Sequence, residues 1–148
     1  MDTESNPPPT CVLNSQFQKA TLTNNITFYT DRNYTLTSVP DDYVGMDMIK
    51  TPNKDRKLTT DSDYLTFEML YDGTVYVAYD SRATSLPNWM GGFSNTGDRI
   101  YTSQNKNLYL IVYSRAYSSG DCVNLGANMA LGFSGKNANN YIMLVDSK

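Results

Sequence analysis

A cluster of residues with recognisable chemistry lies between positions 76 and 89, where a strand-like run gives way to a polar loop. The run ends with Tyr76, Tyr79 and Asp80, and the loop carries Arg82 and the chain's single tryptophan, Trp89. An aromatic ring stacks well on the apolar face of a sugar, while a neighbouring Asp or Arg can hydrogen-bond its hydroxyls. The cluster therefore predicts a carbohydrate-binding site. The structural alternative is that the indole closes one end of the fold and the Asp–Arg pair fixes the loop.

A second group of polar side chains occupies residues 51–57, in a loop between two predicted strands. Four of these residues are charged, and Asp55 and Arg56 are the candidate sugar contacts among them. Arg56 and Lys57 would suit an acidic sugar such as a uronate, because cationic side chains pair well with a carboxylate. A solvated loop explains the same residues without a ligand. The fold decides whether this loop and the Trp89 loop form one site.

The composition excludes several kinds of catalytic chemistry. The 148 residues include no His, which removes Ser–His and Cys–His nucleophile pairs and His-ligated zinc. A glycosidase would need one neutral and one ionised carboxyl group at a set separation, and the candidates are Glu68, Asp80 and Asp98. A small hydrolase or lyase stays open as an alternative, but we expect the chain not to be an enzyme.

Charge and hydropathy bear on partners and cofactors. The formal net charge is −3 and no basic cluster stands out, so we expect no nucleic-acid partner. No apolar run approaches the ~20 residues of a membrane helix, so we expect no membrane partner. No redox or hydride cofactor is expected. The acidic pairs Asp41 with Asp42 and Asp61 with Asp63 could hold a structural calcium ion, or could simply be solvated turns.

The two cysteines, Cys11 and Cys122, are expected to form a disulfide rather than two unrelated buried thiols. Cys11 follows a Pro-rich start, where a chain end would otherwise fray, and Cys122 follows a turn before a predicted strand. Because disulfides persist in oxidising compartments, we expect a secreted, extracellular protein. We interpret residues 1–10 as a linker remnant and residues 11–148 as a single domain.

Short runs rich in β-branched and aromatic residues recur along the chain, separated by Pro, Gly, Asn and Asp. The predicted strands cover residues 26–29, 34–39, 46–51, 64–70, 74–80, 100–102, 107–115, 122–125 and 141–145. Residues 81–97 contain Pro87, Gly91 and Gly92 and are predicted to be irregular, apart from a helical turn near residues 86–89. Eight or nine short strands predict an all-β, antiparallel β-sandwich of jelly-roll-like form.

Two details of the pairing follow from local patterns. Asp72 and Gly73 separate two strand-like runs, and this dipeptide predicts a hairpin between residues 64–70 and 74–80. The runs 107–115 and 141–145 are largely apolar, which predicts central strands.

The run Thr-Val-Tyr-Val-Ala-Tyr-Asp-Ser-Arg-Ala at residues 74–83, with Leu-Pro-Asn-Trp-Met at residues 86–90, resembles a known kind of module. Residues 49–56, 64–67 and 93–97 also fit the pattern. The resemblance, over roughly residues 45–146, is to β-sandwich accessory modules of secreted bacterial polysaccharide-active or surface proteins. The chain departs from the pattern at Ala127, where Gly is expected, and in a longer insert over residues 126–140.

This resemblance implies a non-catalytic, carbohydrate-binding module that holds a secreted multidomain enzyme near its polysaccharide. The implied partners are a polysaccharide or oligosaccharide and the catalytic domain of the parent protein. The alternative is a structural or adhesion β-sandwich module of a surface protein that binds no sugar. Fold and neighbourhood do not fix function, so the site itself has to distinguish the two.

Overall fold

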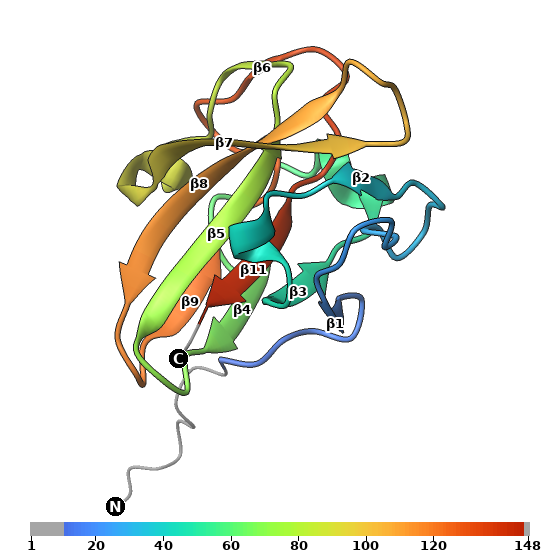
Figure 1. Ribbon diagram of the computed structural model, residues 1–148. Coiled ribbons are helices and arrows are strands. Elements are labelled where there is room, and N and C mark those ends of the chain that lie inside the picture. Colours follow the sequence, from blue (N-terminus) through green and yellow to red (C-terminus); the bar gives the residue numbers. More distant parts are fainter. Residues whose placement is uncertain (1–10, 147–148) are drawn as a thin grey trace, which may run out of the picture.

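The computed structural model describes residues 11–146, and the expected linker, residues 1–10, lies outside the described residues. Its main feature is a curled antiparallel sheet of seven strands, in agreement with the predicted all-β fold (Figure 1). In sheet order the strands are β1 (Gln18–Thr21), β3 (Asp47–Lys50), β11 (Ile142–Asp146), β5 (Gly73–Asp80), β8 (Tyr109–Tyr117), β7 (Ser94–Thr102) and β2 (Leu36–Ser38).

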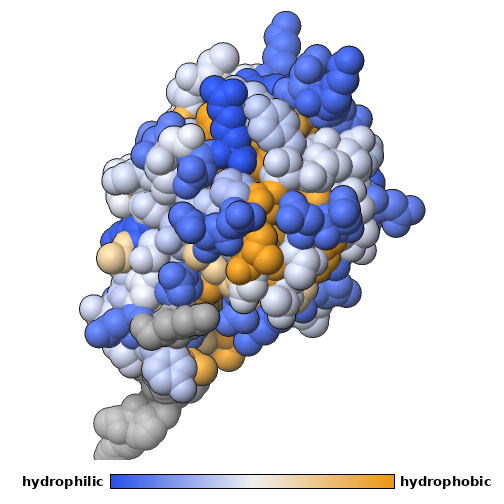
Figure 2. All heavy atoms as spheres, in the orientation of Figure 1, coloured by the Kyte–Doolittle hydropathy of each residue, from blue (hydrophilic) through white to orange (hydrophobic). Residues whose placement is uncertain are grey.

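Over the described residues, two small sheets and three short 3-10 helices accompany the large sheet. The small sheets pair β4 (Leu65–Glu68) with β9 (Cys122–Leu125), and β6 (Ala83–Ser85) with β10 (Ser134–Gly135). The 3-10 helices are η2 (Asp41–Tyr43), η3 (Asn53–Lys57) and η4 (Asn88–Gly92). Over residues 11–146, no helix has the length and apolar character that crossing a bilayer requires. Most of the surface seen in Figure 2 is hydrophilic or intermediate, and apolar residues are exposed near the centre of that face and at its lower end.

Hydrophobic cores lie on both faces of the large sheet, because successive side chains of a strand point to opposite faces. On β5, Val75 and Val77 face one core, while Ala78 faces the other. On β11, Met143 and Leu144 divide in the same way. The first core is covered by β4 and β9, which gives the molecule its sandwich-like form. The predicted central strands are confirmed: β11 lies between β3 and β5, and β8 lies between β5 and β7.

The predicted hairpin between residues 64–70 and 74–80 is wrong. β4 pairs with β9, with Leu65 opposite Leu125, and not with β5. Both edges of β5 are already bonded, to β8 and to β11, so no edge of β5 remains for β4. Asp72 does lie in a turn, where its carboxylate accepts a hydrogen bond from the backbone N–H of Ser119. That turn carries the chain from the small sheet to the large one.

Of the other local predictions, one is confirmed and two differ from the structure. The helical turn near residues 86–89 is confirmed as η4, with Pro87 directly before it. Residues 26–29 form only single bridges at Thr27 and Tyr29, and no strand. Residues 81–97 are less irregular than predicted, because β6 precedes Pro87 and β7 starts after the glycines of η4.

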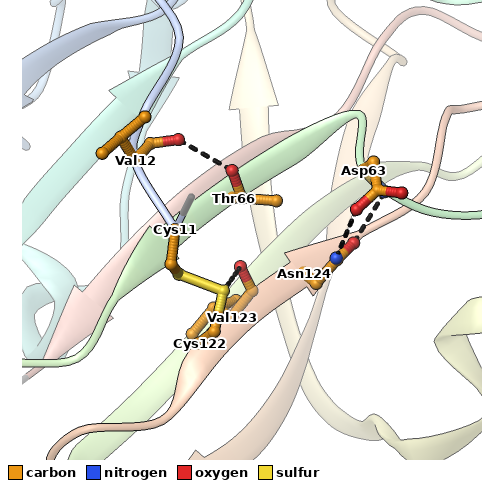
Figure 3. The surroundings of a disulfide bond; sticks show 7 residues. All are labelled: Cys11, Val12, Asp63, Thr66, Cys122, Val123 and Asn124. Carbon is orange, nitrogen blue, oxygen red and sulfur yellow. Dashed lines mark hydrogen bonds between the residues drawn. A yellow bond between two sulfur atoms is a disulfide. The ribbon is translucent and has the colours of Figure 1, made fainter. Parts of the chain in front are cut away.

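The predicted disulfide is present: Cys11 is bonded to Cys122 at the start of β9 (Figure 3). Next to it, the hydroxyl of Thr66 on β4 donates to the carbonyl oxygen of Val12 at 2.7 Å. The cross-link and this hydrogen bond attach the beginning of the described chain to the small β4–β9 sheet. A disulfide of this kind fits an extracellular or secreted protein.

Candidate functional site

A polar pocket of about 330 Å³ opens where several loops meet at the end of β5. Four cationic side chains line it: Arg32, Arg56, Lys57 and Arg82. The remaining polar side chains in its wall are Tyr34, Asn53, Gln104, Asn137 and Asn139. The two polar loops that the sequence analysis treated separately therefore meet, since one supplies Arg56 and the other Arg82.

Arg82 is held in the wall by Asp80, the last residue of β5. The Asp80 side chain is only 1% exposed, and its carboxylate accepts hydrogen bonds from Nε and Nη2 of Arg82, the latter at 2.8 Å. The same carboxylate accepts the backbone N–H of Asn139 at 2.8 Å. The hydrogen bonds to Asp80 raise the pKa of the Arg82 guanidinium, which therefore stays charged. Asp80 thus positions the cation and one further wall segment, and does not itself line the pocket.

Arg56 is positioned by the short helix η3. Asp31 caps this helix, because its carboxylate accepts the backbone N–H groups of Asn53 and Lys54 at 2.7 and 2.9 Å. Arg56 donates from Nη1 to the carbonyl oxygen of Asn53, and the Asn53 side chain donates to Oδ1 of Asn139. A continuous hydrogen-bond network therefore joins η3, through Asn139, to the Asp80–Arg82 pair.

Asp55, the other predicted contact on this loop, has a structural role. Its carboxylate accepts a hydrogen bond from the hydroxyl of Tyr64 at 2.8 Å. Burial and this hydrogen bond raise the pKa of Tyr64. Asp55 is absent from the pocket lining, although Arg56 beside it is present.

The predicted stacking residues Tyr79 and Tyr76 cannot serve one sugar together. Tyr79 is 1% exposed, and its hydroxyl donates to the backbone oxygen of Asn128 inside the first core. A stacking role for Tyr79 is therefore corrected to a core role. Tyr76 lies on the opposite face of β5, where its ring meets Tyr43 edge-on at 5.1 Å. Successive side chains of a strand point to opposite faces of the sheet, so Tyr76 and Tyr79, three positions apart on β5, lie on opposite sides.

Trp89 is half-buried, and its contacts favour a structural role for the indole over stacking on a sugar. Its indole N–H donates to the carbonyl oxygen of Ala127 at 2.8 Å, and its ring lies 5.2 Å from that of Tyr141. A Cβ atom at Gly126 would lie 2.5 Å from Cδ1 of Trp89, so the glycine leaves room for the indole. Trp89 does not belong to the lining of the polar pocket.

Three of the acidic residues considered for other chemistry have hydrogen-bond partners within the fold. Asp61 accepts the backbone N–H of Leu131, and Asp63 accepts from the side-chain amide of Asn124 (Figure 3). Asp98 accepts the hydroxyl of Tyr43. Within residues 11–146, no group of three or more His, Cys, Asp or Glu side chains is placed to hold a metal ion. Glu68, Asp80 and Asp98 do not line a common pocket.

Several pocket residues escaped the sequence analysis. Arg32 lies between two weak strand signals, and Gln104 sits in a short turn between β7 and β8. Asn137 and Asn139 belong to the insert over residues 126–140, whose sequence gives no sign of a site. These residues approach η3 and Arg82 through long-range folding, for which the local sequence carries no marker.

Comparison with known proteins gives one structural likeness. No protein-family model matches the chain, and no curated protein matches it. Among solved structures it is similar to one described as a β-glucuronidase from glycoside hydrolase family 2, with a TM-score of 0.79 and 21% sequence identity. The match covers 90% of this chain and 14% of that enzyme, so the chain corresponds to a small part of it. At this identity, the likeness concerns the fold.

Proposed function

We propose that the chain is a non-catalytic carbohydrate-binding module that directs a secreted multidomain enzyme to a polysaccharide. The observation that carries this proposal is the polar pocket, in which Arg56 and Arg82 from two separate loops meet amide side chains. Guanidinium and amide groups are suitable hydrogen-bond partners for sugar hydroxyls. The pocket volume of about 330 Å³ lies within the ~300–1,000 Å³ that is common for small-ligand sites.

The structure changes which residues carry the proposed binding. Stacking on Trp89 is no longer part of the proposed site, because the indole N–H is already bonded to Ala127 and the ring packs on Tyr141. Arg56 and Arg82 remain, joined by Asn53, Asn139 and their hydrogen-bond network. The ligand is thus expected to be held by polar contacts rather than by stacking on an aromatic ring.

Two further observations support this proposal. The chain shares its fold with part of a protein described as a glycoside hydrolase, in which an accessory module would act beside a catalytic domain. The Cys11–Cys122 disulfide supports a secreted location, where extracellular polysaccharides are available.

Affinity electrophoresis against a panel of plant and algal polysaccharides tests the proposal. We expect at least one of them to retard the protein. Asn137→Gly removes one amide from the pocket at a residue with a φ of 59°, which glycine adopts freely, and should weaken the retardation. Asn25→Gly is the matched control, because Asn25 has a φ of 68° and does not line this pocket.

The outcomes separate the proposal from its alternatives. Absence of retardation by every polysaccharide would contradict sugar binding and favour a structural or adhesion module. One observation favours that second candidate. Leu70 and Tyr71 are 73% and 63% exposed beside an apolar groove, and exposed apolar patches often mark surfaces that bind other proteins. Release of reducing sugar from a bound polysaccharide would instead show that the chain is an enzyme.

A further inference from the structure

We propose that the polar pocket recognises an anionic sugar unit, and that Arg56 and Lys57 bind its negative group. This inference rests on the proposed carbohydrate-binding function and specifies the class of ligand. It depends on how the four cations of the pocket are paired, on the hydrogen-bond donors that they retain, and on the charge of the rest of the chain.

Two of the four cations are neutralised by neighbouring carboxylates. Arg32 lies 3.1 Å from Asp31, and Arg82 lies 2.8 Å from the buried Asp80. Within residues 11–146, Arg56 and Lys57 have no carboxylate oxygen within 4.0 Å of their charged nitrogens. Counted over the part of the chain that the structure describes, the pocket carries an excess of two positive charges, although the formal net charge of the full sequence is −3.

The two cations without a carboxylate partner differ in a useful way. Arg56 is half-buried and donates only from Nη1 to the carbonyl oxygen of Asn53, so it retains donors for a ligand. A planar guanidinium can donate two parallel hydrogen bonds to one carboxylate or sulfate group. Lys57 is exposed at the pocket and adds a compact positive charge. Together they offer a negative group both directional bonds and charge.

The neutral part of the wall is fixed before any ligand arrives. Asn53 donates to Oδ1 of Asn139, and Asn139 donates to Oε1 of Gln104. Asn53 and Asn139 are buried and already bonded, so they fix this wall, while the exposed amide of Asn137 in the same pocket can bond the hydroxyls of a sugar whose acidic group lies on the cations. Carboxylates of uronic acids and sulfate esters share this chemistry, and the experiment distinguishes them.

Because the chain as a whole is acidic, its retention by an acidic polysaccharide would be informative. A protein of net charge −3 is repelled on average by a polyanion, so retention on an acidic polysaccharide requires a local positive site. Such retention should weaken as salt is added, because screening reduces the attraction between exposed charges. A neutral polysaccharide held by hydrogen bonds would show little dependence on salt.

Affinity gels containing polygalacturonate, dextran sulfate or neutral dextran measure the preference directly. We expect retention on the polygalacturonate or the sulfated gel, and we expect Arg56→Gln and Lys57→Gln each to weaken it about tenfold or more. Lys54→Gln is the matched control, because Lys54 is on the same helix and loses the same charge but does not line the pocket. It should change the affinity less than about twofold. Comparison of the two acidic gels identifies the anionic group.

Three results would overturn this inference. The first is binding of neutral polysaccharides that is insensitive to salt and unchanged in Arg56→Gln, which would leave the carbohydrate-binding function standing. The second is equal retention by single-stranded RNA, which would show general polyanion binding. The third is an equal loss of binding in Lys54→Gln and Lys57→Gln, which would show a diffuse charge effect. Failure to bind any polysaccharide would contradict the proposed function as well.

Discussion

Removal of the Cys11–Cys122 disulfide should lower the stability of the domain substantially. The bond joins residues that are 111 positions apart, so it restricts most of the chain in the unfolded state. In the chain-entropy model a loop of this length corresponds to about 16 cal/mol/K, or about 5 kcal/mol at 25 °C. For a domain of this size, that loss corresponds to a fall in Tm of roughly 10–20 °C.

The experiment compares the oxidised protein, the reduced protein and a Cys11→Ser, Cys122→Ser double variant in urea and thermal unfolding. Cys122 is exposed, so serine there buries no new polar group, and agreement between the reduced protein and the variant isolates the cross-link. The dependence of the unfolding free energy on urea should also become steeper, because an unlinked chain exposes more surface when it unfolds.

A fall in Tm of less than about 3 °C, with an unchanged urea dependence, would refute this reasoning. It would mean that the unfolded chain gains little freedom from the loss of the bond, and that the attachment seen in Figure 3 acts only locally.

Two further predictions concern packing and pH. Gly126→Ala should destabilise the fold by about 1–3 kcal/mol, because its Cβ would lie 2.5 Å from both Cδ1 of Trp89 and the backbone oxygen of Asp61. Urea unfolding and a red shift of the tryptophan fluorescence would report it, and unchanged values would contradict the packing. Burial raises the pKa of Tyr43 to about 12 and also raises the pKa of Tyr79. Because unfolded tyrosines ionise near pH 10, stability should be constant in this respect below pH 10 and should fall as the pH rises to 12. Full tyrosinate absorbance near pH 10 in a still-folded protein would contradict this.

The parts of the fold that were predictable are those that depend on neighbouring residues. The apolar run at residues 141–145 could only be covered on both faces, and β11 is indeed central. Pro87 suits the start of a helical turn, and η4 follows it. Cys11 and Cys122 are the only two cysteines, so their pairing required only that the fold bring them together.

Pairings over long distances were not predictable in this way. Asp72 and Gly73 suggest a hairpin on local grounds, yet β4 joins β9 because both edges of β5 are taken by other strands. Which strands pair with β5 depends on segments far apart in the chain, and a two-residue turn motif carries no information about them.

The candidate site likewise combines features that neighbouring residues predict with features that depend on distant segments. Residue types indicated polar contacts at Arg56 and Arg82, and both line the pocket. The burial of Tyr79 depends on what covers β5, and the presence of Arg32 and Asn139 depends on two loops arriving from elsewhere. Chemistry could be inferred from residue types, whereas convergence in space required the structure.

The position of Asp80 and Asn139 has a consequence for the timescale of motion in the pocket. Asp80 ends β5 and Asn139 lies just before β11, and these adjacent central strands are shared by both hydrophobic cores. The backbone N–H of Asn139 donates to the buried carboxylate of Asp80 at 2.8 Å. This part of the wall therefore has little freedom to open locally, and its amide hydrogen should exchange with solvent only when the whole sheet comes apart. A ligand would meet a site that is already rigid, and would lose little affinity to the ordering of that wall.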